Sequence, residues 1–429
     1  MAARNAMSNQ ERECLQKELA THQETAGQGY QSLHKDKEAV KKASNSTIIT
    51  FDMMQNLPVP TLTHNSMFYL RQLWEYNFGV HDCTTDSATM YMWSELVAKR
   101  GADEICSCLM QYISNLPLQV KKLTCYSDSC FGQNKNFEMI CFWNWQIVQG
   151  RFSQIDHKFL VRGHTYLPND RDFSHIEKKK DTAVVYIPTH WEELVRKVCR
   201  QKPYTVKSMV GSEFKDFSDL VEQHTRRRKD SNKKDVLISK ARWMNFGQGV
   251  DQHGREVKHL NEVWLRYSYS LDESWSKVSL LKGRKKIPPA TSISLPIKYP
   301  NGHSILKTKV QDLKKMIPYL PEEHKQFYID LRTSNEALHE VVIPRIAADW
   351  SLVADYLEYE VEDKKLIREK CHHDPLKCCV ELLENWLSTN KGASPKSWSK
   401  LIEILRQIKI LTSITEIIVQ DLAKAGVFV

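Results

Sequence analysis

The sequence of 429 residues lacks the features that would direct a chain to a membrane. No apolar run near its start resembles a signal peptide, and no stretch of about twenty apolar residues could span a bilayer. It also lacks a disulfide framework, because its eleven cysteines are odd in number and form no paired Cys-x-x-Cys knuckles. We therefore expect an intracellular protein in the cytoplasm, with the nucleus as a second compartment, and no membrane partner.

Charge is spread unevenly along the chain. The net charge is +9, but residues 336–429 hold twelve Lys and Arg against fifteen Asp and Glu, which leaves forty-nine against thirty-seven upstream. With 41% hydrophobic and 10% aromatic residues, the composition is that of a folded protein of two or three domains. This difference in net charge suggests that the basic larger part and the mildly acidic tail bind different partners. Many globular domains without such partners are, however, equally basic.

Changes in pattern divide the chain into four regions. In the second region, short β-favouring runs alternate with apolar helical segments, which is typical of an α/β layer fold. The third region is basic and aromatic-rich, and the fourth has apolar residues at helical spacing. The regions are a polar helical lead-in (1–45), an α/β core (46–200), a β-rich basic part (201–334) and an all-α tail (335–429).

Two predicted strands of the core end in a carboxylate. Residues 46–51 lead to Asp52, and residues 122–127 lead to Asp128. A third strand, over 155–161, precedes a polar segment that runs into a helix. The pattern also predicts helices within 91–114 and over 137–149 and a short strand over 184–187.

Carboxylates at the ends of neighbouring strands can meet at one edge of a sheet. Asp52, Asp128 and the pair Asp170 and Asp172 would then form a cluster that binds Mg²⁺ or Mn²⁺ and supports phosphoryl transfer. The alternative is structural, because aspartates at strand ends are common helix caps and turn formers. The pattern alone leaves both readings open.

Residues 128–136, Asp-Ser-Cys-Phe-Gly-Gln-Asn-Lys-Asn, and residues 163–172, with Gly-His-Thr leading to Asp-x-Asp, resemble motifs of an uncharacterised transposon-derived family. Ser129 stands where that family usually has Asn, and the resemblance spans roughly residues 46–334. It implies a ribonuclease-H-like fold of the transposase and integrase kind, with Mg²⁺ or Mn²⁺ as cofactor and DNA as a partner. The implied catalytic residues are Asp52, Asp128 and either Asp170 or Asp172, with Glu177 as a rival third member, and the implied metal ligands are Asp52, Asp128 and Asp172.

Other residues of this part have weaker functional readings. His164 would polarise a phosphate or steady the Asp-x-Asp loop, and a hydrogen-bonded structural histidine is the alternative. Lys135 and the run Arg226, Arg227, Arg228 and Lys229 are candidate nucleic-acid contacts, since basic side chains among aromatic ones bind phosphates and stacked bases. The alternative is a solvated basic loop beside an aromatic β core.

The tail has a different pattern. Residues 350–357 (Trp-x-x-Val-Ala-x-x-Leu), 383–387 (Leu-x-x-Trp-Leu) and 397–405 (Ser-Trp-x-x-Leu-x-x-x-Leu) resemble the death domain. That resemblance implies a six-helix bundle without catalytic residues that assembles with other death domains. The candidate contact residues are the exposed charges Glu362, Asp363, Lys364 and Arg368.

Together these features predict a signalling protein, with roles such as apoptosis, that joins a death domain to a domesticated transposase-like domain. Its expected partners are other death-domain proteins and DNA, without a small-molecule substrate. The alternative is an active metal-dependent nuclease or transposase to which a death domain is appended.

Overall fold

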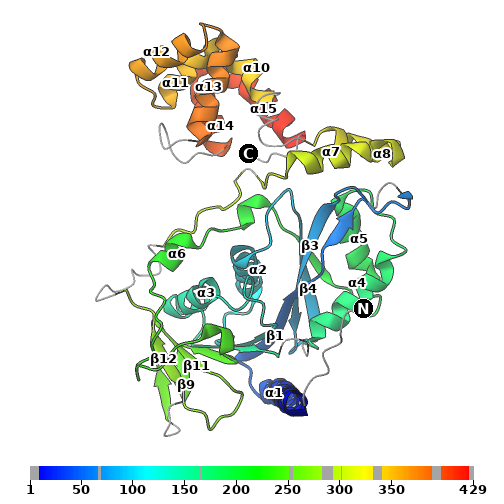
Figure 1. Cartoon of the computed structure of the whole chain (residues 1–429), viewed down its shortest axis with the longest axis vertical. Coiled ribbons are helices and arrows are strands. Elements are labelled where there is room, and N and C mark those ends of the chain that lie inside the picture. Colours follow the sequence, from blue (N-terminus) through cyan, green and yellow to red (C-terminus); the bar gives the residue numbers. More distant parts are fainter. Residues whose placement is uncertain are drawn as a thin grey trace.

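The computed structural model describes residues 9–65, 69–161, 163, 166–250, 255–282, 293–300, 302–331, 341–388 and 398–424. Within the larger part of the chain, ten strands form one mixed sheet (Figure 1). Nine of its strands follow the order β12-β11-β8-β6-β5-β1-β3-β4-β7. The tenth, β2, is not part of this order and pairs with β3.

The centre of the sheet combines parallel and antiparallel pairs. β1 (Ser46–Met53) runs parallel to β5 (Lys122–Ser127), which runs parallel to β6 (Gln154–Phe159). On its other side, β1 pairs antiparallel with β3 (Leu73–Asp82), which forms a hairpin with β4 (Ser87–Ser94). The five strands therefore lie in the spatial order β4-β3-β1-β5-β6.

Strands from residues beyond 200 extend both edges of this sheet. β7 is added parallel to β4, and β8, β11 and β12 continue antiparallel beyond β6. The two expected regions 46–200 and 201–334 therefore share one sheet. The remaining strands are β2 (Leu57–Val59), β7 (Thr205–Ser208), β8 (Trp243–Phe246), β9 (Gln248–Val250), β10 (Glu256–Lys258), β11 (Glu262–Arg266) and β12 (Ser276–Ser279).

Helices cover both faces of the sheet (Figure 1). On one face, α2 (Ala102–Asn115) and α3 (Phe137–Val148) bury their apolar residues against Ile49 and Phe51 of β1. The opposite face carries α4 and α5 over β3 and β4. The other helices of this part are α1 (Asn9–Val40), α4 (Pro168–Lys180), α5 (Pro188–Val198), α6 (Ser218–Glu222), α7 (Lys307–Lys315) and α8 (Glu322–Ile329).

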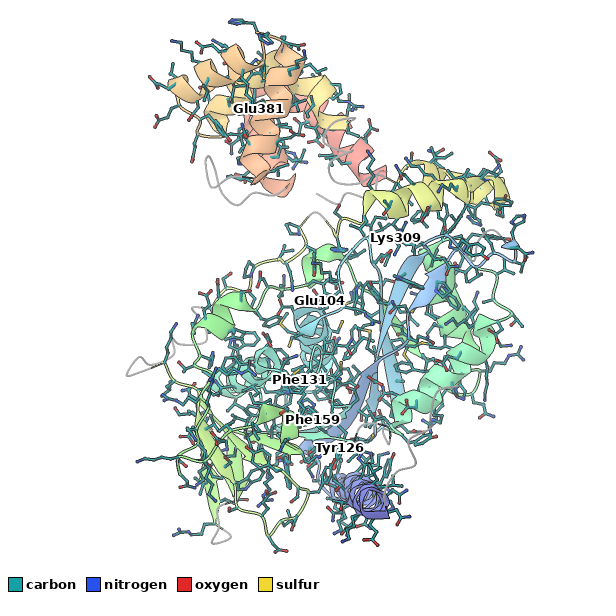
Figure 2. All side chains as sticks on the ribbon, viewed as in Figure 1. Glu104, Tyr126, Phe131, Phe159, Lys309 and Glu381 are labelled. Atoms are coloured by element: carbon teal, nitrogen blue, oxygen red, sulfur yellow. The ribbon has the colours of Figure 1, made fainter. Side chains whose placement is uncertain are left out.

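Helix α1 is fixed to the sheet by a partly buried polar contact that includes Tyr126, which Figure 2 shows beside this helix. The Lys158 ammonium and the Tyr126 hydroxyl both donate to Asp36 Oδ2, each at 2.6 Å. The side chain of Lys158 is only 5% exposed. Leu33 packs beside this contact against Ile48 and Tyr126. The expected polar lead-in is therefore a helix that covers the same face as α4.

The C-terminal residues form a compact group of helices with its own core. Val353, Leu383 and Trp386 are fully buried in it, and Arg345 donates to Asp421 at 2.5 Å to join the first helix to the last. The all-α prediction for this part is confirmed. The helices are α10 (Ile343–Ile346), α11 (Trp350–Tyr356), α12 (Val361–Lys370), α13 (Pro375–Ser388), α14 (Trp398–Gln407) and α15 (Thr412–Lys424).

Two predicted elements of the core are wrong. Residues 91–94, expected in a helix, belong to strand β4, and the helix starts only at Ala102. Residues 184–187 form no strand, although Val185 exchanges backbone and side-chain hydrogen bonds with Thr61. In the described part of the chain, no helix has both the length and the apolar character needed to cross a membrane.

Candidate carboxylate site

The alternation of side chains along strands places Asp52 and Asp128 on the same face. Thr50 of β1 bonds to α4, and Tyr126 of β5 bonds to α1, so both residues face the α1 and α4 side of the sheet. Thr50 and Tyr126 are register partners. Because strand side chains alternate with a period of two, Asp52 and Asp128 follow them on that face, at the carboxyl ends of adjacent strands.

Asp170 reaches the same edge from the first turn of α4. The preceding residue, Asn169, is fully buried and holds the start of this helix against two strands. It accepts a hydrogen bond from Thr50 Oγ1 at 2.6 Å and donates to the Gly79 carbonyl at 2.9 Å. A Cβ on Gly79 would lie 2.7 Å from the ring of Phe173, so glycine allows α4 this close approach. Asn169 is therefore a positioning residue for Asp170.

The three carboxylates interact through their charges. Burial, and then the charges of Asp128 and Asp170, raise the pKa of Asp52 to about 7. Burial also raises the pKa of Asp170, and the charges of Asp128 and Glu177 raise it further. Mutual repulsion of this kind is relieved when a cation binds between the carboxylates.

One oxygen of each carboxylate is held by the protein. Asp52 Oδ1 accepts from the Met53 N–H at 2.8 Å, and Asp170 Oδ2 accepts from the Leu167 N–H at 2.7 Å. Asp128 Oδ1 accepts from the side chain of Asn134 at 2.6 Å. The donor chemistry, three carboxylates each with a second oxygen, fits Mg²⁺ or Mn²⁺. Within the described residues, however, no three His, Cys, Asp or Glu side chains are already close enough to hold a metal ion.

The motif residues after Asp128 build the loop that holds it. The Cys130 N–H and the Asn134 side chain both donate to Asp128 Oδ1. Ser129 Oγ donates to the Leu160 carbonyl at 2.9 Å, which ties the loop to the end of β6. Asn136 accepts from the Met139 N–H at 2.8 Å and caps α3. Capping thus falls to Asn136, and Asp128 is left to face the carboxylate site.

A buried histidine supports the backbone of Asp128. Trp143 Nε1 donates to His157 Nδ1 at 3.1 Å, which leaves the ring hydrogen on Nε2, facing Ser127 Oγ at 2.9 Å. Ser127 Oγ in turn donates to the carbonyl of Asp128 at 2.9 Å. Burial, aided by the charge of Lys135, lowers the pKa of His157 to about 3. The neutral ring therefore keeps this chain of donors in place at physiological pH.

Lys135 lies in the interior beside the site. Its side chain is 1% exposed, and its ammonium sits 4.9 Å from the ring centre of Phe159. Among the described residues, Nζ has no hydrogen-bond partner. Burial and the charge of Arg242 lower the pKa of Lys135 to about 7, against the opposing effect of Asp128. The predicted nucleic-acid contact is not available to this buried ammonium in the structure.

The other predicted catalytic residues lie elsewhere. Asp172 is two residues after Asp170, about 200° around the helix, and its buried carboxylate accepts from His81 Nδ1 at 2.7 Å. The structure thus separates Asp172 from Asp52 and Asp128 and brings Asp170 to them. Glu177 is exposed on α4 and affects Asp170 only through its charge. His164 lies outside the described residues.

The predicted contact residues are on the surface, but several have partners within the chain. In the run from Arg226 to Lys229, all four residues are exposed, Arg227 donates to two backbone carbonyls near β12, and Lys229 pairs with Asp235 at 2.7 Å. On α12, Glu362 is exposed and Asp363 is half-buried. Lys364 pairs with Asp355, and Arg368 lies 5.5 Å from the ring of Trp350.

Sequence reasoning did not single out Asn169, His157 or a function for Asn134. Asn169 directly precedes Asp170, and Asn134 belongs to the motif that contains Asp128. Both could have been noticed as short amide side chains next to candidate carboxylates. His157 gives no such signal, because its role follows from its neighbours on β5 and α3.

Comparison with known proteins adds one match. Residues 77–245 match a family model described as a domain of unknown function (DUF7869). The matched segment runs from β3 to β8 and contains Asp128 and Asp170, while Asp52 lies before it. No curated protein and no solved structure matches the chain.

Proposed function

We propose that this chain is a signalling protein that assembles through its C-terminal helices in the manner of death domains. We further propose that its larger part is a domesticated, ribonuclease-H-like domain of transposase origin. Because that domain keeps a carboxylate site, the second function proposed for the chain is metal-dependent cleavage of DNA.

The assembly function rests on the architecture of the tail. In the described residues of the tail, six α-helices enclose several positions of the death-domain-like pattern, with Trp350, Leu383 and Trp386 buried, whereas Leu387 is exposed. Those side chains are occupied by the core, so binding falls to the outer surface. There α12 exposes Val361 and Leu366 next to the charged Glu362. Apolar side chains rimmed by charge suit a protein interface whose partner is chosen by electrostatic complementarity.

Replacing Glu362 by lysine is expected to weaken self-association or capture of another death domain by roughly tenfold. The measurement is co-precipitation and sedimentation of differently tagged copies of the full chain. Glu323→Lys, an equally exposed charge reversal on α8, is the matched control and is expected to change nothing. Equal association of both variants and the wild type, or no association of any of them, would argue against the assembly function.

The nuclease function rests on the convergence of Asp52, Asp128 and Asp170. The order β4-β3-β1-β5-β6, with β1 parallel to β5 and antiparallel to β3, supports the ribonuclease-H-like assignment. In this reading Asp52 and Asp128 are the metal ligands, and Asp170 takes the third position in place of Asp172. A bound Mg²⁺ or Mn²⁺ would supply Lewis-acid stabilisation of a phosphate and of an attacking water.

The protein residues have defined tasks in this reaction. Asn134 and the Met53 N–H orient one oxygen of Asp128 and of Asp52, so the other oxygen of each is free to turn toward a cation. Asn169 fixes the start of α4 and thereby the position of Asp170. Since no three ligands are preassembled among the described residues, cation binding would draw the carboxylates together.

Asp128→Asn is expected to reduce Mg²⁺- or Mn²⁺-dependent nicking of DNA by roughly a hundredfold or more, because one anionic ligand is lost. The assay compares plasmid nicking by the full chain with and without the metal. Glu323→Gln removes an exposed carboxylate on α8 and serves as the control. Nicking by the Asp128 variant at the wild-type rate, or no nicking by either protein, would remove the support for this second function.

A further inference from the structure

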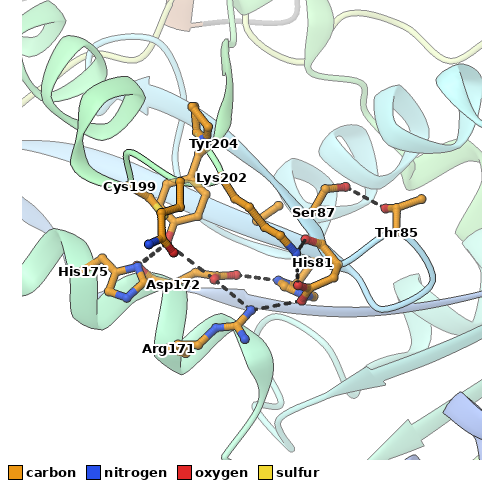
Figure 3. Close-up of a pocket in the computed structure, with 13 residues that line it drawn as sticks. His81, Thr85, Ser87, Arg171, Asp172, His175, Cys199, Lys202 and Tyr204 are labelled. Atoms are coloured by element: carbon orange, nitrogen blue, oxygen red, sulfur yellow. Dashed lines mark hydrogen bonds and ion pairs between the residues drawn. The ribbon is translucent and has the colours of Figure 1, made fainter.

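A cavity of about 620 Å³ lies against α4 on the side of Asp172 (Figure 3). Three separate segments line it: the turn between β3 and β4, the first two turns of α4, and the stretch from Cys199 to Tyr204. Since Asp170 and Asp172 point to opposite sides of the helix, this cavity is distinct from the carboxylate site. Nothing in the proposed functions uses it.

Three basic side chains, Arg171, His81 and Lys202, lie near one another in this cavity (Figure 3) and contact one carboxylate, that of Asp86. Arg171 and His81 Nε2 each lie 3.3 Å from Asp86 Oδ1, and Lys202 bonds to Oδ2. The three side chains come from α4, β3 and the stretch after α5. The fold thus brings together groups that are 31 to 121 positions apart. Asp86 contacts all three of them, and Asp172 contacts His81 and Arg171.

The histidine of this group is held rigidly from behind. His81 is 2% exposed, and its Nδ1 bonds to the buried Asp172 at 2.7 Å. Tyr204 donates to the backbone carbonyl of Asp172 at 3.3 Å, and its hydroxyl lies 2.7 Å from His175 Nδ1. The ring of His81 is thereby held in one orientation, with its Nε2 edge toward Asp86.

Asp86 contacts the three groups unequally. The hydrogen bond from Lys202, with that from Arg171, lowers the pKa of Asp86 to about 2. Arg171 and the ring of His81, however, share a single oxygen at 3.3 Å, and charge-assisted hydrogen bonds are typically about 2.7–2.9 Å long. A carboxylate has two oxygens in one plane and one negative charge. A phosphate group offers a separate oxygen to each of three donors and carries more charge. The arrangement of donors therefore matches a phosphate better than the side chain that now occupies it.

We propose that this cavity is a phosphate-binding site in which the Asp86 carboxylate occupies the anion position until a phosphate group displaces it. The side chain of Asp86 is 50% exposed, so rotation about its Cα–Cβ bond moves the carboxylate into solvent without a change in the backbone. Arg171, Lys202 and His81 then face the phosphate. Asp172 stays paired with His81 and also lies 3.7 Å from Arg171, so it shares that guanidinium with the phosphate.

The test is titration of the full chain with inorganic phosphate, followed by calorimetry, for the wild type and Asp86→Asn. Asparagine keeps the left-handed backbone at this position, where φ is +51°. Because the competing carboxylate is gone, the variant is expected to bind phosphate roughly tenfold more tightly or better. Adding Lys202→Gln to that variant is expected to return the affinity to the wild-type level or below it.

Two further arms make the result decisive. Glu322→Gln removes a surface carboxylate that also pairs with a lysine, Lys325, and it is expected to leave phosphate affinity unchanged. A 5′-phosphorylated oligonucleotide compared with the same oligonucleotide lacking that phosphate distinguishes a nucleic-acid terminus from free phosphate as the source. The inference is overturned if Asp86→Asn shows no saturable binding up to about 10 mM phosphate, or if its affinity rises no more than that of Glu322→Gln.

This inference is independent of the proposed functions. Asp86, Arg171 and Lys202 are not among the residues that converge with Asp52, so the nicking assay and the phosphate titration report on different sites. Loss of nicking in Asp128→Asn would say nothing against the phosphate site. Likewise, a failed phosphate titration would leave the carboxylate site unaffected.

Discussion

Replacing Asp52 by asparagine is expected to stabilise the folded protein by roughly 2–4 kcal/mol at pH 8. The pKa of this carboxyl is raised from 3.8 to about 7 by burial and by its acidic neighbours. At about 1.4 kcal/mol for each tenfold change, keeping it ionised in the folded state costs roughly 4 kcal/mol at most. Asparagine removes that cost and can still accept from the Met53 N–H.

The sign of this effect fixes its dependence on pH. Because the folded protein holds the Asp52 proton more tightly than the unfolded chain, this group makes stability fall as the pH rises from about 4 to about 7. The free energy of unfolding, measured by urea denaturation across this range, should show that slope in the wild type and a shallower one in Asp52→Asn.

Asp172→Asn is the matched control for this measurement. It removes another buried carboxylate of the same region, but one that bonds to His81, and it should therefore destabilise the protein. An Asp52→Asn protein that is less stable than the wild type at pH 8 would mean that Asp52 has a favourable partner. Mg²⁺ should stabilise the wild type more than the variant if the carboxylates bind the metal.

Replacing Lys135 by methionine should also stabilise the folded protein, by roughly 2–4 kcal/mol at pH 7. Burial lowers the pKa of this ammonium from 10.5 to about 7, and no described residue accepts a hydrogen bond from it. Methionine has a comparable length, and its sulfur would lie near the ring of Phe159. The cost of burying a charge is then exchanged for apolar contact.

For Lys135, the dependence of folding stability on pH has the opposite sign to that for Asp52. The unfolded chain holds the Lys135 proton more tightly, so this group makes stability rise as the pH increases from about 7 to about 10.5. The gain in stability of Lys135→Met over the wild type should therefore disappear near pH 10.5. Lys240→Met, at an exposed lysine, is the control and should change stability by no more than about 0.5 kcal/mol. A destabilised Lys135→Met protein would contradict the assignment of an unpaired ammonium.

Strand β1 and the position of its carboxylate could be predicted because local preference and burial agree. Residues 46–51 are β-favouring, and both faces of the strand are covered by helices. Strand β4 was missed for a related reason. Consecutive residues such as Tyr91, Met92 and Trp93 are all buried, so the alternation that marks a strand with one solvent face is absent.

The choice between Asp170 and Asp172 could not be made from the sequence. Both belong to the same Asp-x-Asp string, and a helix with 3.6 residues per turn sends such neighbours to opposite sides. Which side meets β1 is set by Asn169 and Gly79, through contacts between residues 90 positions apart. Lys135 was misjudged because a cation in a polar motif looks solvated, whereas the loop turns it inward over Phe159.

The contact between Asp36 and Lys158 also limits when helix α1 can pack onto the sheet during synthesis of the chain. The two residues are 122 positions apart, so at about 5–20 residues per second a ribosome needs roughly 6–24 s to deliver Lys158 after Asp36. Strand β1 follows α1 directly, but β5 is complete only 91 positions after Asp36, and β6 is still later. Until then α1 has only part of its packing surface, which its largely polar sequence suits. The contacts of α1 with the sheet can therefore be completed only after Lys158 has been made, while β8, β11 and β12 are still to be synthesised.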